Sequence, residues 1–155
     1  MSKLLLCAAF LGMGGIYGTR AEEPAATTAD DLIATRQADM AVQTSLLESI
    51  MMAIGADADI LPLKDAAEAI EALGMAIPEL FPEGTERGHN TRARPAVWSD
   101  RAGFEKAAAN LTEAARRMAN AAATDNRTGF AKANLETVAA CSTCHMAYRG
   151  ARIKP

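Results

Sequence analysis

The segment LKDAAEAIEALGMAIPEL, residues 63–80, indicates an amphipathic helix that packs within a helical bundle. Apolar residues fill two positions of a heptad, one with Leu63, Ile70 and Ile77 and the other with Ala66, Leu73 and Leu80. Residues spaced in this way lie on one face of a helix, and burial of that face requires neighbouring helices. Pro78 cannot donate a backbone hydrogen bond, so we expect the helix to end or kink there.

A second amphipathic helix is expected before this segment. Thr28 and Asp31 have the spacing of a helix N-terminus. Beyond them one apolar stripe repeats every seven residues and consists of Ile33, Met40, Leu47 and Ile54. The helix is therefore expected to run from Thr28 to about Gly55.

Two more helices are expected after a long irregular loop over residues 82–95, which is rich in proline and glycine. Ser99 and Asp100 can cap the first of these helices. Its apolar stripe consists of Phe104, Leu111 and Met118. Residues 124–129 are expected to form a turn, and the last helix is expected over about 130–149.

The composition favours an all-α chain. Of the 155 residues, 50% are hydrophobic and only 5% are aromatic, and strand-forming residues are scarce beside helix-forming ones. Four amphipathic segments in a chain of this size predict an antiparallel four-helix bundle. An all-β fold is excluded.

Charge and motif content exclude two classes of function. The 16 lysine and arginine residues against 19 acidic residues give a net charge of −3, so a nucleic-acid partner is not expected. We recognise no paired carboxylates, Ser-His-Asp set or phosphate-binding loop. We therefore do not expect an enzyme that turns over an organic substrate.

Residues 1–21 are typical of a secretory signal peptide. Lys3 precedes an apolar stretch, and Ala21 precedes an acidic segment. The apolar stretch is short and interrupted by glycines, so it is a poor permanent membrane span. We expect no membrane span in the protein that remains after the signal peptide is removed. Cys7 would leave with the signal. We expect a mature domain of residues 22–155 in a bacterial periplasm.

Cys141-Ser142-Thr143-Cys144-His145 is a Cys-x-x-Cys-His motif, which is typical of c-type haem attachment. Positions i, i+3 and i+4 share one face of a helix, so both cysteines and the histidine can contact the same group. The thiols of Cys141 and Cys144 suit thioether bonds to the two vinyl groups of one haem. His145 is then the expected proximal ligand of the iron.

Three alternatives to haem attachment are less consistent with the sequence. A thiol-disulfide oxidoreductase would place its cysteine pair near a βαβ unit, and no strands are expected here. A zinc site would need a fourth ligand, and the other histidine, His89, lies in the distant loop. A structural disulfide would need no histidine and would join residues only one helical turn apart. Covalent haem is the preferred interpretation.

Several segments occur together with this motif in a characteristic order. The motif lies far into the last expected helix and is followed by MAYR, residues 146–149. The upstream segments are Arg36-Gln37 with Met40, LFPEGT at residues 80–85 and RPAVWSD at residues 94–100. Over essentially the whole mature chain, this arrangement resembles the cytochrome c′ family.

The resemblance implies a four-helix bundle that holds one haem and often forms a homodimer through its first two helices. Arg36 and Gln37 match positions beside the haem, where the Arg36 guanidinium could pair with a propionate. Arg94 matches a loop position near the same edge. Arg149 matches an arginine near the proximal histidine that can influence small ligands there.

Met40 matches the residue that faces the distal side of the iron in this family. If its sulfur ligates the iron, the haem is six-coordinate and suits electron transfer with redox partner proteins. If the sulfur stays away, Met40 is apolar packing, and nitric oxide or carbon monoxide can bind the open position. The sequence therefore predicts a single-electron carrier, a binder of small diatomic gases, or both. The alternative is a protein that scavenges or senses nitric oxide.

Overall fold

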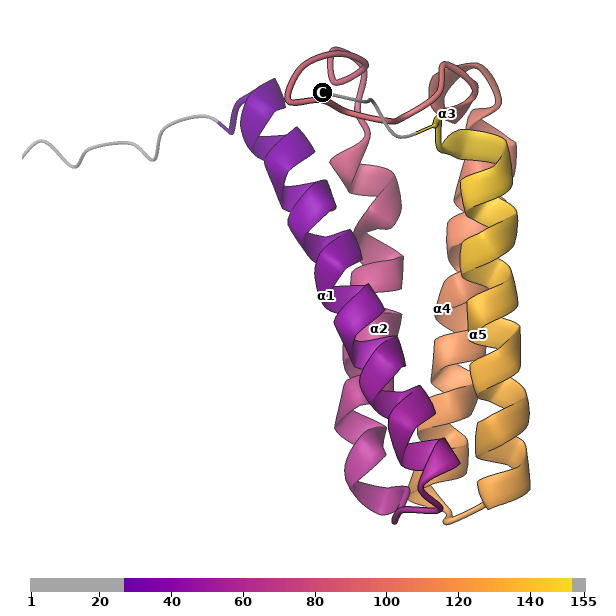
Figure 1. Ribbon diagram of the computed structural model, residues 1–155. Helices are drawn as coiled ribbons and strands as arrows, with labels where there is room; N and C mark the ends of the chain where they lie inside the picture. The colour runs from indigo at the N-terminus through magenta and orange to yellow at the C-terminus, as the bar shows by residue number, and fades with distance from the viewer. Residues whose placement is uncertain (1–26, 152–155) are drawn as a thin grey trace, which may run out of the picture.

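The computed structural model describes residues 27–151, which form an antiparallel bundle of four long helices (Figure 1). The long helices are α1 (Ala29–Gly55), α2 (Lys64–Ala76), α4 (Arg101–Ala123) and α5 (Arg127–Tyr148). Three short helical segments join them, namely η1 (Leu61–Leu63), η2 (Ile77–Leu80) and α3 (Ala96–Ser99). The predicted all-α four-helix bundle is confirmed.

The predicted signal peptide, residues 1–21, lies outside the described residues. Between residues 27 and 151, no helix is both long enough and apolar enough to cross a membrane. The same part of the chain contains no strand beyond one isolated β-bridge between Ala93 and Arg149.

Polar side chains set where α1 and α5 begin. Thr28 accepts a hydrogen bond from the backbone N–H of Asp31 at 3.1 Å, and the Asp31 carboxylate accepts one from the Thr28 N–H at 3.0 Å. This reciprocal pair is the capping box that the sequence predicts. Asn126 accepts from the Gly129 N–H at 2.9 Å. Since Asn126 caps α5, this helix begins three residues earlier than expected.

The buried face of α2 is rotated slightly from the heptad pattern. Ala67, Ile70 and Gly74 are its buried residues, whereas Leu73 is only half-buried. A side chain at Gly74 would bring its Cβ within 2.8 Å of the Thr112 hydroxyl oxygen on α4. The absence of a side chain at Gly74 therefore lets α2 and α4 approach each other closely, and this contact sets the buried face. As predicted, the α-helix ends before Pro78 and continues as the 3-10 turn η2.

One end of the bundle carries the loop of residues 82–95, next to the start of α1 and the end of α5 (Figure 1). The Arg94 N–H donates to the Tyr148 carbonyl at 2.9 Å, and the Gly150 N–H donates to the Arg92 carbonyl at 2.6 Å. These bonds attach the loop to the end of α5. They bring residues far apart in the sequence to the place where α5 carries its Cys-x-x-Cys-His motif.

Candidate haem-binding site

The last turns of α5 present the motif toward α1. Cys141, Cys144 and His145 are all half-buried, and both thiols are free. All three line a cavity between α5 and the other helices. The predicted common face of the motif is therefore present in the structure.

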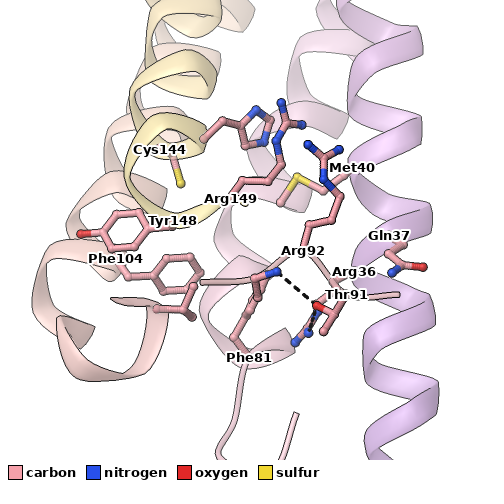
Figure 2. Close-up of a pocket in the computed structure, with 13 residues that line it drawn as sticks. Arg36, Gln37, Met40, Phe81, Thr91, Arg92, Phe104, Cys144, Tyr148 and Arg149 are labelled. Carbon is pink, nitrogen blue, oxygen red and sulfur yellow. Dashed lines mark hydrogen bonds between the residues drawn. The ribbon is translucent and has the colours of Figure 1, made fainter. Parts of the chain in front are cut away.

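A first cavity, with a volume of about 250 Å³, lies between α1, the loop and the end of α5 (Figure 2). Figure 2 shows Met40 reaching from α1 toward the side chains of α5, with Phe81 and Phe104 on the opposite wall from α1. The cavity is also lined by Arg36, Gln37, Thr91, Arg92, Cys144, His145, Tyr148 and Arg149. This cavity joins three expected site residues of α1 to the motif.

The second cavity, of about 390 Å³, continues along α1 away from the loop. It shares four lining residues with the first cavity, namely Met40, Cys144, His145 and Arg149. Because the shared residues include Met40 and the motif, the two cavities meet between them. Met40 of α1 and His145 of α5 thus face the same space.

The residues around this space fit a flat, largely apolar group such as haem. The second cavity is lined by small side chains that permit close approach, including Ala107, Ala108 and Ala140. Gln43 also lines it, and its buried Nε2 has no hydrogen-bond acceptor in the part of the chain that the structure describes. Two thiols and an imidazole on one helical face are the donor set that covalent haem requires.

The environment of His145 favours a neutral imidazole. Burial lowers the pKa of His145 below its usual value, and the positive charges of Arg149 and Arg92 lower it further. A neutral imidazole has a free nitrogen lone pair, which is the form that ligates a metal. His145 is therefore prepared for ligation at neutral pH.

The two thiols have the opposite character from those of a redox-active pair. Burial raises the pKa of Cys141, and both burial and the neighbouring Cys141 raise the pKa of Cys144. Reactive dithiol sites instead lower the pKa of one thiol. The environment thus gives the oxidoreductase alternative no support.

Arg36 lies at the site but its guanidinium is directed into the loop. The side chain is 3% exposed, and its Nη1 donates to the Thr85 hydroxyl at 2.9 Å and to the Leu80 carbonyl at 3.2 Å. Its Nη2 donates to the Thr85 carbonyl at 2.8 Å and to the Thr91 hydroxyl at 2.7 Å (Figure 2). The guanidinium also lies 4.3 Å above the ring of Phe81. Arg36 therefore organises the loop, a role that the sequence analysis missed.

Gln37 and Arg94 are also bonded to the loop end of the bundle. The Gln37 Nε2 donates to the His89 carbonyl at 2.9 Å. Arg94 donates from Nη1 to the carbonyls of Met146 and Ala147 at 3.0 and 3.3 Å, at the C-terminal end of α5. A cation at this helix end also complements the helix dipole. Arg94 lies on the rim beside His145 and Arg149 but not in either of the two cavities.

His89 lies outside the cavities on the exposed loop. Its Nε2 lies 3.4 Å from a carboxylate oxygen of Asp30. Between residues 27 and 151, no three side chains of histidine, cysteine, aspartate or glutamate gather in a way that could hold a metal ion. The zinc alternative therefore gains no support.

The lining residues that were absent from the expected site include Gln43, Phe81, Arg92 and Tyr148. Gln43 had a sequence signal, because a polar residue one turn after Met40 interrupts the apolar face of α1. Phe81 and Tyr148 lie inside segments that carried the family resemblance. Arg92 had no signal other than its position near Arg94.

Comparison with known proteins decides the family. The family described as Cytochrome C′ matches residues 31–149. This chain belongs to the cytochrome c′ family. The cytochrome c′ of Rubrivivax gelatinosus is 42% identical over 86 residues, which cover 53% of this chain and 66% of that protein. This chain thus spans about two thirds of the length of that relative.

Solved cytochrome c′ structures share the fold. A cytochrome c′ with an unusual ligand-controlled dimer dissociation has a TM-score of 0.76 and 25% identity, covering 82% of this chain and 100% of that one. The nitric oxide complex of a cytochrome c′ variant from Alcaligenes xylosoxidans has a TM-score of 0.72 and 25% identity. The match covers 80% of this chain and 98% of that one. The resemblance stated from the sequence is confirmed, and the chain is a haem protein of this family.

Proposed function

We propose that this cytochrome c′ family protein binds a small diatomic gas at its haem iron and carries single electrons, without turning over an organic substrate. The observation that carries the proposal is that Met40 and His145 face the same space from α1 and α5. His145 supplies the proximal ligand. Met40 then controls access to the opposite side of the iron.

The remaining site residues hold the group and shape its surroundings. Cys141 and Cys144 attach the haem through thioether bonds, and Arg149 lies beside His145 at the rim. When bound, the haem supplies an iron that changes between two oxidation states and can bind a small neutral ligand. Arg36 and Gln37 hold the loop closed over the edge of the site through their bonds to Thr85, Thr91 and His89.

Two roles of Met40 give two functions. Gas binding is supported by a similar solved structure, the nitric oxide complex of the Alcaligenes xylosoxidans variant. In this role Met40 packs over an open coordination position of the haem iron. A protein that binds gas in this way could also scavenge or sense nitric oxide. The second candidate is an electron carrier in which the Met40 sulfur ligates the iron, supported by its place opposite His145.

Optical spectra before and after addition of carbon monoxide distinguish the two roles. We expect a high-spin spectrum that changes with the gas. Met40→Ala should leave the spin state unchanged, since no ligand is lost. The electron carrier would instead be established by a low-spin spectrum that carbon monoxide does not change. The spectrum of Met40→Ala should then change when the gas is added. Met52→Ala is the matched control, because Met52 is 69% exposed on the same helix and lines neither cavity.

We further propose that residues 1–21 direct export to the periplasm and that the mature protein, residues 22–155, forms a homodimer. The N-terminal pattern of residues 1–21 supports export. Dimer formation is supported by the similar cytochrome c′ with a ligand-controlled dimer dissociation. Cell fractionation with N-terminal sequencing should find a periplasmic protein that starts at Glu22. Analytical ultracentrifugation should find twice the mass of one chain, and a single chain at all concentrations would refute the dimer.

A further inference from the structure

Gln43 is a buried amide whose donor has no acceptor among residues 27–151. The side chain is 4% exposed, and its Nε2 is fully buried and forms no hydrogen bond. A buried donor without an acceptor lowers the free energy of unfolding, whereas an apolar group of the same shape does not carry this penalty. A helix position on an apolar face would therefore favour leucine over glutamine, unless an acceptor arrives with a bound molecule.

The position of Gln43 along α1 indicates where that molecule lies. Arg36 and Gln37 line only the first cavity, Met40 lines both cavities, and Gln43 lines only the second. Gln43 follows Met40 by three residues, which is about 4.5 Å along the helix axis at 1.5 Å per residue. The amide therefore lies beside Met40, on the side away from Arg36 and Gln37.

The other side chains around the second cavity do not satisfy the amide. Its deep wall is apolar and consists of Leu47, Ile77, Ala108 and Leu111. Thr44 is exposed, and its hydroxyl already donates to the Met40 carbonyl at 2.9 Å. Glu48 and Ser142 also line this cavity but are exposed to solvent. The acceptor for Gln43 is thus absent from the protein wall.

We infer that Gln43 donates a hydrogen bond to a small ligand bound on the Met40 side of the haem iron. The inference rests on the proposed function, since it requires haem held by the motif on α5. A buried amide beside this apolar deep wall stabilises ligands that carry a hydrogen-bond acceptor at their outer atom. Gln43 is therefore the residue that sets which small ligands this chain retains.

The test uses carbon monoxide as the probe in the full haem-loaded protein. Met40→Ala opens the iron position whichever role Met40 has, and Gln43→Leu is then added to it. Loss of a donor to the bound gas should raise its C–O stretching frequency. It should also speed dissociation about 2- to 10-fold, the effect of one ordinary hydrogen bond. Ser45→Ala in the same background is the control, because Ser45 is exposed on α1 and lines neither cavity.

An unchanged stretching frequency and dissociation rate in the double variant would overturn the inference. Failure of the proposed function gives a different result. In that case carbon monoxide binds the Met40→Ala protein, and Gln43→Leu still changes its frequency, but the unmodified protein does not bind the gas.

A second measurement needs no haem. In the haem-free protein, Gln43→Leu should raise the urea concentration at the midpoint of unfolding, because it removes a buried unpaired donor. A lower midpoint would mean that the amide has a partner within the chain. That result would overturn the inference even if the motif never acquired haem.

Discussion

The Tyr148 hydroxyl at the end of α5 donates a hydrogen bond of 2.7 Å to the Asp100 carboxylate at the start of α4. The other oxygen of Asp100 accepts from the Gly103 N–H at 3.2 Å and caps α4. One carboxylate thus joins the beginning of α4 to the end of α5. Since Tyr148 follows His145 by three residues, this bond fixes the turn that presents His145.

The Tyr148 bond predicts a loss of stability in alkali. The hydrogen bond to Asp100, followed by burial, raises the pKa of Tyr148 from 10.0 to about 12. The folded protein therefore keeps this proton while the unfolded chain loses it, so the contribution is complete below pH 10 and disappears between about pH 10 and 12. Tyr148→Phe should unfold at lower urea concentration than the unmodified protein at pH 8, with the difference shrinking above pH 10. A difference independent of pH would contradict the assignment.

Gly103→Ala should destabilise the protein, although alanine is the better helix former by about 1 kcal/mol. A Cβ at this position would collide with the Asp100 carboxylate and the Tyr148 hydroxyl. We expect the free energy of unfolding to fall by about 1–3 kcal/mol, as in other overpacked sites. Gly55→Ala is the control, because a Cβ there meets nothing within 4 Å. Equal effects of the two substitutions in urea unfolding would refute the steric argument.

Arg36→Leu should cost at least about 2 kcal/mol of unfolding free energy, because it leaves buried oxygens of the loop unpaired. The acceptors are the carbonyls of Leu80 and Thr85 and the hydroxyls of Thr85 and Thr91. Arg117→Leu removes an arginine from an exposed ion pair with Glu136 and should cost less than about 1 kcal/mol. Similar losses for both variants in urea unfolding would show that Arg36 does not organise the loop.

The helices could be predicted from the sequence because their signals are local. The Thr28 capping box, the break at Pro78 and the heptads of α1 and α2 each depend on residues within two turns of one another. The start of α5 was placed too late, since Asn126 was assigned to a turn instead of a cap. The buried face of α2 depends on the contact of Gly74 with Thr112, which no local pattern contains.

The site was predictable only in part for the same reason. Cys141, Cys144 and His145 lie within five residues, so helix geometry alone brings them together. The partners of Arg36 are 44 to 55 residues away, and its role in the loop required the folded structure. Gln43 was passed over because the sequence shows that it is polar, but not that its donor is buried without an acceptor.

His145→Ala should separate attachment of the haem from ligation of its iron. The two thiols of Cys141 and Cys144 remain available, so we expect the variant to bind haem covalently in cells that attach haem. The optical spectrum should change, because the half-buried imidazole on the α5 side is lost. A spectrum identical to that of the unmodified protein would exclude His145 as the proximal ligand.

The intact mass of the mature protein, purified from bacteria that attach c-type haem, tests the central claim most directly. The account predicts the mass of residues 22–155 plus one haem, with no thiol available for alkylation at Cys141 or Cys144 after denaturation. Cys141→Ser and Cys144→Ser together should abolish the added mass. A bare polypeptide mass for the unmodified protein, with two thiols that can be alkylated after reduction, would contradict the account.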